Sequence, residues 1–412
     1  MFNLASIQAA LQQFQLDGWL IYDFRGLNLL ARRIVELPDD QMGSRRWFYF
    51  IPASGQPRKL VHRIESSALD HLPGEKSVYL KWQELEAGVG QLLSGAKRVA
   101  MEYSPRNAIP YVSRVDGGTL ELVRSFGVEV VSSGDLIQLF EATLDDEQIA
   151  MHLAAAVYTD AAYGQAWKFI AERVKGGGGV RETEVQALIM RHFAENGLTT
   201  YHPPIVGANA HSGDPHFDTS PATDVEIREG DFVLIDLWAK LDKPRSVYSD
   251  LTRVGFVGRS VPEKYERIFQ IVAAARDAAI ATVKDAFTAK RPLAGWQVDN
   301  ACRAVVEKAG FGQYFIHRTG HSIGQEVHGN GANMDGLETR DERTILPRTC
   351  FSIEPGIYQP EFGVRSEVNV LIDAAGAVRV TGGALQTSID AAGAVRVTGG
   401  ALQTSVVPIL NA

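Results

Sequence analysis

Histidines and carboxylates gather in the C-terminal part of the chain at a spacing that could hold metal ions. Histidine makes up only 10 of the 412 residues, yet His317, His321 and His328 stand in one short segment, HRTGHSIGQEVH. Two glutamates follow in short apolar runs, Glu354 in FSIEPGIY and Glu367 in GVRSEVNV. A buried carboxylate is costly unless it is paired or bound to a metal. The density of these groups therefore predicts a site.

Two aspartates interrupt apolar runs upstream in the same way. Asp236 lies in DFVLIDLW and Asp250 in SVYSDLTRVGFV, runs rich in the residue types of β-strands. A lone aspartate in such a run is more often a bulge or an edge charge, and His321 alone would more often be a core histidine. Together, four carboxylates and one imidazole without a thiolate form an oxygen-rich set. Such a set suits manganese or magnesium, with cobalt or zinc as alternatives, and two divalent ions would balance four negative charges.

The order Asp236, Asp250, His321, Glu354, Glu367 resembles that of the pita-bread metallopeptidases, with GHSIG, IEPGIY and GVRSE as the surrounding motifs. This family includes methionine aminopeptidase, Xaa-Pro aminopeptidase, Xaa-Pro dipeptidase (prolidase) and creatinase. The resemblance implies two divalent metal ions, with Mn(II) preferred to Co(II) or Zn(II). In it Asp250 and Glu367 bridge both ions, Asp236 completes one, and His321 with Glu354 completes the other. It also implies hydrolysis by a metal-bridged hydroxide, with Glu354 moving the proton from the water to the leaving nitrogen.

Five further residues receive roles from the resemblance. His328 and His216, the latter in DPHFD, match histidines that bind the scissile carbonyl or the substrate amide and stabilise the developing charge. His317 matches a histidine that lines the proline-side pocket, where Tyr358 and Phe362 could add apolar surface. Arg365 is expected to orient a metal-bound carboxylate. Arg340 stands where prolidases carry an arginine for the free carboxylate of a dipeptide. The alternative for both arginines is a solvated surface charge.

Around these residues the sequence predicts an α+β protein. Residues 1–144 alternate short strands and helices and should form a small α/β, creatinase-like domain. Residues 145–388 should form the pita-bread catalytic domain, in which a helix pair followed by antiparallel strands occurs twice with pseudo-twofold symmetry. Its first helix should end at the four glycines Gly176 to Gly179. Ser260 and Glu263 form a capping-box pattern before the third. The strands that carry the two glutamates are expected at Phe351 to Tyr358 and at Val364 to Ile372.

The C-terminal end contains an identical tandem repeat. The segment Ile372 to Ser388 recurs letter for letter as Ile389 to Ser405. The first copy should complete a terminal β-hairpin that turns at Gly376. Residues 389–412 then hold the second copy and a tail, and we expect no chemistry in either copy and no reserved place for the second one.

Composition and resemblance together limit the function. A net charge of −8 and a pI near 5.7 argue against a nucleic-acid partner. The chain has neither the start of a signal peptide nor an apolar run of transmembrane length, which predicts a cytoplasmic protein without a membrane partner. The leading hypothesis is a peptidase for small peptides with proline at the second position, expected to be a homodimer. The alternatives are a creatinase-like hydrolase, which works without metal, and an inactive binding protein. Retention of all five ligands argues against both.

Overall fold

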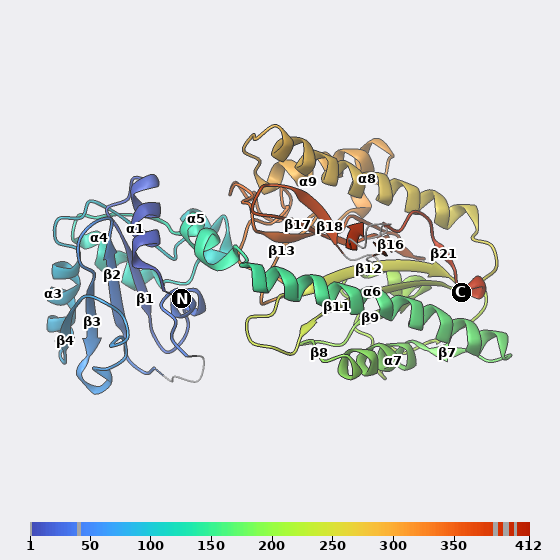
Figure 1. The fold of residues 1–412 in the computed structure, drawn as a ribbon, viewed down its shortest axis with the longest axis horizontal. Helices are drawn as coiled ribbons and strands as arrows, with labels where there is room; N and C mark the ends of the chain where they lie inside the picture. Colours follow the sequence, from blue (N-terminus) through green and yellow to red (C-terminus); the bar gives the residue numbers. More distant parts are fainter. Residues whose placement is uncertain (1, 39–42, 382–385, 390–394, 399–401) are drawn as a thin grey trace. The chain divides into compact units, whose positions relative to one another are not determined.

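The chain divides into two compact units, Met1–Glu141 and Ala142–Ala412, and Figure 1 shows the elements of both. The computed structural model describes residues 2–38, 43–381, 386–389, 395–398 and 402–412. Within these ranges no helix combines the length and the apolar composition needed to cross a bilayer.

The first unit is a six-stranded mixed sheet with helices on both faces. Apart from Asp23 at the end of β1, strands β1 and β2 are rich in apolar and aromatic residues, as expected of strands that are covered on both sides. Trp19 and Ile21 of β1 pack with α1 and α2, whereas Leu20 and Tyr22 pack with α3 and α4 on the other face. The strand order is β4-β3-β2-β1-β5-β6, in which only β2 is antiparallel to its neighbours. The elements are α1 Leu4–Gln13, β1 Gly18–Asp23, α2 Leu29–Ile34, β2 Trp47–Pro52, β3 Arg58–His62, β4 Glu75–Tyr79, α3 Trp82–Leu92, β5 Arg98–Met101, α4 Gly117–Ser125, β6 Glu129–Ser132 and α5 Gly134–Ile137.

The second unit contains two helix pairs, each packed on strands. Helices α6 and α7 share a core with β9, β11 and β12, and α8 and α9 share another with β14 to β18. Asp145 caps α6 by accepting the N–H of Gln148 at 2.9 Å, and the glycine run ends this helix as predicted. Helix α8 begins at Glu263 after Pro262 and has no side-chain cap, so the predicted capping box with Ser260 is wrong. The four helices are α6 Asp146–Lys175, α7 Glu182–Glu195, α8 Glu263–Thr288 and α9 Gly295–Lys308.

The strands of the second unit place the acidic residues of the two halves. In the hairpin of β11 and β12, Asp236 lies opposite Thr252. The prediction that Glu354 and Glu367 lie inside continuous strands is wrong. Glu354 lies in the break between β14 and β15, and Glu367 in the break between β16 and β17. Pro355 explains the first break, because proline has no N–H for a ladder hydrogen bond. The strands are β7 Val180–Arg181, β8 Leu198–Thr199, β9 Ile205–Ala208, β10 Glu226–Ile227, β11 Phe232–Leu241, β12 Ser249–Phe256, β13 Ser322–Ile323, β14 Cys350–Ile353, β15 Gly356–Tyr358, β16 Gly363–Arg365, β17 Val368–Ile372, β18 Val378–Thr381 and β21 Val407–Pro408.

The two copies of the repeat take different places. The first forms the predicted hairpin of β17 and β18, which turns at Gly376 with φ +82°. Strand β19 (Gln386–Ile389) pairs with β20 (Val395–Thr398) in the same register, with Ile389 opposite Val395. At the end of the second copy, the Gln403 side chain bonds to both the N–H and the carbonyl of Val254, at 3.2 and 2.8 Å. The expectation that the second copy has no reserved place is therefore wrong for its last residues.

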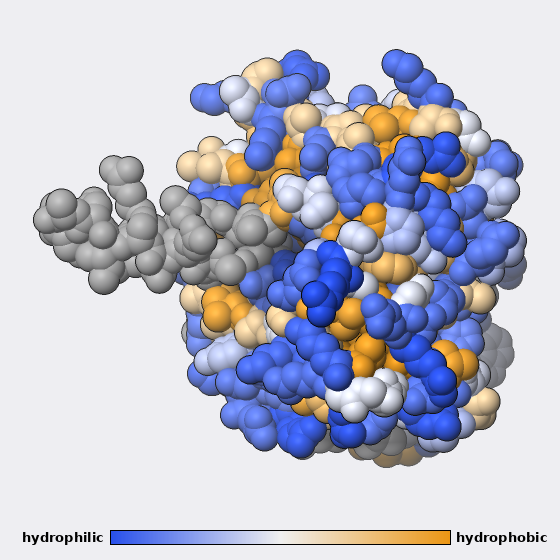
Figure 2. All heavy atoms as spheres, turned by 90° about the vertical axis from the view of Figure 1, so that its right-hand side faces the viewer, coloured by the Kyte–Doolittle hydropathy of each residue, from blue (hydrophilic) through white to orange (hydrophobic). Residues whose placement is uncertain are grey.

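Hydrophilic side chains cover most of the face of the second unit that Figure 2 shows, and hydrophobic ones emerge only between them. This face carries the C-terminus of the chain. The apolar residues of this unit are thus largely used in its cores.

Candidate metal centre

Five acidic and imidazole side chains come together in the second unit. Asp236 and Asp250 come from β11 and β12, His321 stands just before β13, and Glu354 and Glu367 lie in the two strand breaks. Nε2 of His321 lies 3.4 Å from Oδ2 of Asp250 and 3.3 Å from Oε1 of Glu354. One ligand atom from each of Asp250, His321 and Glu367 lies within 4.8 Å of the other two. Four of the five residues are buried, and the Glu354 side chain is 14% exposed.

The orientation of His321 suits a bound cation. Nδ1 of this ring lies 3.1 Å from the carbonyl oxygen of Ser322, and a carbonyl only accepts, so Nδ1 carries the proton. The lone pair of Nε2 therefore faces the carboxylate oxygens of Asp250 and Glu354. Burial, reinforced by the nearby cation of Arg318, holds the pKa of His321 well below its usual value. A neutral imidazole between carboxylates is a typical metal ligand.

Two buried carboxylate oxygens in this cluster have no hydrogen-bond partner among the described residues, Oδ1 of Asp236 and Oε1 of Glu367. The second oxygen of each is anchored, in Asp236 by Arg365 and in Glu367 by the Thr252 hydroxyl at 2.7 Å. An unpartnered buried acceptor is destabilising. A cation would satisfy both oxygens at once, so the residues present fit a divalent metal centre.

Burial and mutual repulsion shift the carboxyl groups toward protonation. Burial raises the pKa of Asp250 and Glu367 well above the usual range, and the neighbouring carboxylates raise it further. Burial also raises the pKa of Glu354 to about 7. For Asp236 burial again raises the pKa, while the Arg365 guanidinium opposes it. Four such groups can all be ionised only if cations neutralise them.

A chain of hydrogen bonds leads from Asp236 to His317. The guanidinium of Arg365 contacts Asp236 and donates to the Thr252 hydroxyl at 2.9 Å and to the Tyr358 hydroxyl at 3.0 Å. Tyr358 lies 2.8 Å from Nε2 of His317. Nδ1 of His317 faces the carbonyl of the next residue at 2.7 Å, so Nδ1 holds the proton and Nε2 accepts from the Tyr358 hydroxyl. Arg365 is buried and engaged, unlike a surface charge.

The other two predicted histidines lie beside the cluster. The rings of His328 and His321 meet edge to face, with centroids 4.4 Å apart. Burial, with a contribution from Arg318, lowers the pKa of His328 to about 4. His216 is exposed and lies close enough to Asp236 and to His328 for an electrostatic interaction with both. Both histidines are thus close to the candidate metal ligands.

Arg340 lies apart from these contacts. Its guanidinium carbon lies 4.7 Å from the centroid of the Trp296 ring, and its Nε pairs with Glu342 at 3.2 Å with both side chains mostly exposed. These contacts give the predicted carboxylate-binding role no support, and it stays a prediction. Phe362 is also removed from the site, since it packs in the core against Phe232 and Tyr265.

The sequence analysis does not identify several residues at the site. Thr252 anchors Glu367 and Arg365, and its position two residues after Asp250, on the same face of β12, is a signal that could have revealed it. The rings of Tyr201 and Trp238 are tilted by 34° to one another, with centroids 6.1 Å apart. Burial and then the charge of Asp250 raise the pKa of Tyr201. Nothing in the local sequence distinguishes these aromatic residues from core residues.

Comparison with known proteins agrees with this geometry. Metallopeptidase family M24 matches residues 150–374, more than half of the chain. The chain is 28% identical over 336 residues to a probable dipeptidase, PepE, of Mycobacterium tuberculosis, covering 80% of this chain and 82% of that protein. It is 31% identical over 292 residues to an Xaa-Pro dipeptidase of Pyrococcus horikoshii, with coverages of 70% and 74%.

The fold is also similar to that of a solved dipeptidase. The crystal structure of PepE from Mycobacterium ulcerans superimposes with a TM-score of 0.65 at 25% identity, covering 92% of this chain and 94% of the other. The helix pairs and sheets of the second unit correspond to the pita-bread fold of such enzymes. The chain therefore belongs to metallopeptidase family M24.

Proposed function

We propose that this metallopeptidase carries two divalent ions and hydrolyses Xaa-Pro bonds, in dipeptides or at the N-termini of peptides. The observation that carries the proposal is the pair of buried, unpartnered carboxylate oxygens on Asp236 and Glu367 beside a neutral His321. Asp236, Asp250, His321, Glu354 and Glu367 would hold the ions. Manganese suits this set because four of the five ligands are carboxylates.

Glu354 is the proposed proton carrier. Two bound divalent ions would polarise the scissile carbonyl and acidify water. The Glu354 carboxylate then accepts a proton from the attacking water and returns it to the leaving nitrogen. Ser352 donates to Oε1 of Glu354 at 3.1 Å, which fixes the orientation of the carboxylate.

The histidines supply donors to the substrate. Since burial and Arg318 lower the pKa of His328 to about 4, its ring is neutral at pH 7 and donates one hydrogen bond, which we assign to the developing oxyanion. His216 is the second proposed donor. His317, held by Tyr358, forms a wall beside the metal ligands. An Xaa-Pro bond has no N–H, so its site needs an apolar wall and a donor to the leaving nitrogen. The similarity to the Xaa-Pro dipeptidase of Pyrococcus horikoshii supports this choice.

A substrate panel tests the specificity. Manganese-loaded protein should cleave Ala-Pro with a kcat/KM at least about tenfold above that for Ala-Ala. A comparison with Ala-Pro-Gly separates a dipeptidase from an aminopeptidase. Equal rates on Ala-Pro and Ala-Ala would refute the proline preference. Hydrolysis of creatine in EDTA would favour the creatinase-like alternative, and turnover of no substrate would favour a binding protein.

The proton carrier is tested by Glu354→Gln. This variant should lower kcat by about 10²- to 10⁴-fold, the usual effect of losing a general acid or base. Glu361→Gln is the matched control, because Glu361 is exposed and close in sequence. A Glu354→Gln variant with nearly full turnover would contradict the assignment.

A further inference from the structure

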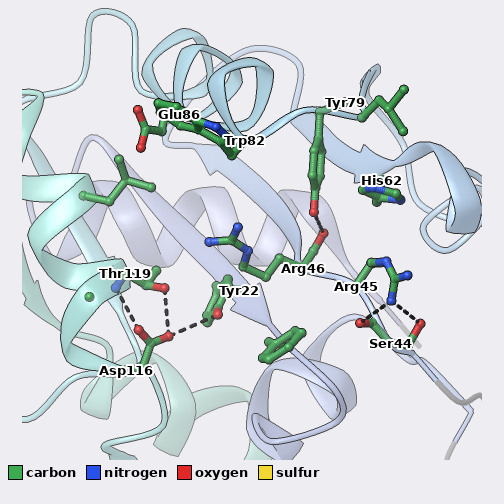
Figure 3. Close-up of a pocket in the computed structure, with 14 residues that line it drawn as sticks. Tyr22, Ser44, Arg45, Arg46, His62, Tyr79, Trp82, Glu86, Asp116 and Thr119 are labelled. Atoms are coloured by element: carbon green, nitrogen blue, oxygen red, sulfur yellow. Dashed lines mark hydrogen bonds between the residues drawn. The ribbon is translucent and has the colours of Figure 1, made fainter.

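The first unit contains a pocket that no step of the proposed reaction uses (Figure 3). Its volume is about 830 Å³, within the range of small-molecule sites. The lining residues come from the ends of β1, β3 and β4, the start of β2, and the first turns of α3 and α4. Because β2 is antiparallel to its neighbours, these strand ends share one edge of the sheet. Ligands of open α/β sheets bind outside the carboxyl ends of the strands.

Two arginines line the pocket, Arg45 and Arg46. Arg45 donates back to the carbonyl and hydroxyl of Ser44 at 3.2 and 3.1 Å, so Arg46 is the cation available to a ligand. Figure 3 shows its guanidinium in the open centre of the lining side chains. Among the described residues its side chain has no ion pair, and its side-chain hydrogen-bond partner is the Tyr79 hydroxyl. The two nearby phenols are already used, because Tyr79 donates to the Arg46 carbonyl at 2.8 Å and Tyr22 donates to Asp116 at 3.1 Å. A guanidinium has five N–H donors, so one bond to Tyr79 leaves most of them available to bind an anion.

His62 adds a second hydrogen-bond donor to the same wall. The residue is 8% exposed and lines the pocket. Its Nδ1 accepts the N–H of Ile64 at 3.1 Å, so the proton of the neutral ring lies on Nε2. Within the described part of the chain Nε2 has no partner, although Tyr79 packs against the ring at 4.9 Å. This N–H is therefore available to a ligand in the pocket.

Large apolar side chains surround the mouth of the pocket. Trp82 is 63% exposed, Leu80 46% and Phe24 37%. Single exposed apolar residues are ordinary, but three around one pocket mark a binding surface. The ligand therefore has an apolar part beside its anionic group.

A carboxylate completes the set. Glu86 lies one turn after Trp82 on the same face of α3, is exposed, and has no ion pair within the described residues. Asp116 is engaged, because its oxygens accept the N–H and hydroxyl of Thr119 at 2.9 and 2.8 Å. In Figure 3, Trp82 and Glu86 lie on one side of the Arg46 guanidinium, and Asp116 on the other.

We propose that this pocket binds a free α-amino acid with an apolar side chain. The ligand's carboxylate bonds to Arg46 and to Nε2 of His62, its ammonium group faces Glu86, and its side chain covers Trp82 and Phe24. An inorganic anion would leave the apolar mouth uncovered and would be repelled by Glu86. Binding here does not depend on the chemistry of the metal centre.

Calorimetric titration of L-phenylalanine into the manganese-loaded full chain tests the proposal. The same titration of Glu367→Ala excludes binding at the metal centre, and this variant should keep the site. Arg46→Met should weaken binding at least about tenfold, Arg46→Lys should weaken it less, and the control Arg63→Met should change nothing, because Arg63 is exposed outside the pocket. Phenethylamine, which lacks the carboxylate, and 3-phenylpropionate, which lacks the ammonium group, should both bind more weakly.

Trp82→Ala keeps the proposal testable even if Arg46→Met unfolds, because Trp82 is largely exposed. This variant should weaken the binding of L-phenylalanine but not that of glycine. Four outcomes would overturn the proposal: no saturable binding up to about 20 mM ligand, unchanged affinity in both Arg46→Met and Trp82→Ala, loss of binding in Glu367→Ala, or conversion of a dimer to a monomer by Trp82→Ala. The last would assign the apolar mouth to a protein interface.

Discussion

Removing the metal should make the stability of the second unit depend on the charge of Glu354. Burial raises the pKa of this carboxyl from 4.5 to about 7. A carboxyl whose pKa is higher in the folded than in the unfolded protein stabilises the fold fully below the unfolded value, and this stability is lost as the pH rises through the folded value. In metal-free protein the contribution of Glu354 should therefore decline between pH 4.5 and pH 8.

The size of the effect follows from the two pKa values. At 1.36 kcal/mol for each pH unit, the interval from 4.5 to about 7 corresponds to about 3 kcal/mol of unfolding free energy at pH 8. Glu354→Gln removes this charge and should therefore stabilise the metal-free second unit by up to that amount. For a unit of this size the melting temperature should rise by about 6 to 12 °C. Below pH 4.5 this gain should vanish.

Calorimetry of wild type and Glu354→Gln in EDTA, from pH 4.5 to pH 8.5, measures the difference. Saturating manganese should reverse the order, because wild type then keeps a proposed ligand that the variant lacks. The exposed Glu361→Gln serves as the control and should follow wild type at every pH. Equal melting temperatures of wild type and Glu354→Gln at pH 8 in EDTA would refute the argument from buried charge.

Three other expectations concern the rest of the second unit. Deleting Ile389 to Ser405 should change the melting temperature by less than about 2 °C. The reason is that Gln386 then stands three residues before Val406 in the sequence, as Gln403 does now. A larger loss of melting temperature in the deletion than in Gln403→Ala would contradict this. His152 is buried on α6, and burial lowers its pKa from 6.5 to about 4. The contribution of the neutral ring to the stability of the folded protein is therefore complete above pH 6.5 and is lost as the pH falls toward 4. Urea unfolding should show the advantage of wild type over His152→Asn shrinking by about 2 kcal/mol from pH 7 to pH 5, and a constant difference would count against it. Tyr358→Phe removes the hydroxyl between Arg365 and His317 and should lower kcat/KM about tenfold at unchanged manganese content, whereas a loss of manganese would assign the hydroxyl to metal binding instead.

The candidate metal ligands were predictable because each breaks a local rule. Asp236 and Asp250 place charges in runs that are otherwise suited to buried strands, and the structure puts both on neighbouring strands. The partners of these residues were less accessible to sequence reasoning. Arg365 reaches Asp236 across 129 positions of the chain, a contact that only the packing of the two halves creates.

Elsewhere local sequence was insufficient for physical reasons. Phe362 is an apolar residue close in sequence to the proposed ligands, but it packs in the core, because the tertiary fold and not the local sequence decides where this side chain is buried. The repeat is a stronger case, since Gln386 and Gln403 have identical neighbours. The contacts of Gln403 with Val254 and Arg276 come from the tertiary fold, so no local signal predicts them. The pocket of the first unit likewise joins residues that only the strand order brings to one edge.

Without cations, burial at the candidate metal centre favours the uncharged forms of both its carboxyl groups and its imidazole. Burial raises the pKa of the carboxyl groups of Asp250 and Glu367 and lowers the pKa of His321, so without metal the site favours protonated acids beside a neutral ring. Binding of divalent ions must therefore displace protons, and metal affinity should rise with pH. The apolar cores that bury these residues thus make the second unit less stable without metal, and the same burial supplies the dry surroundings in which charges on the substrate are strongly felt.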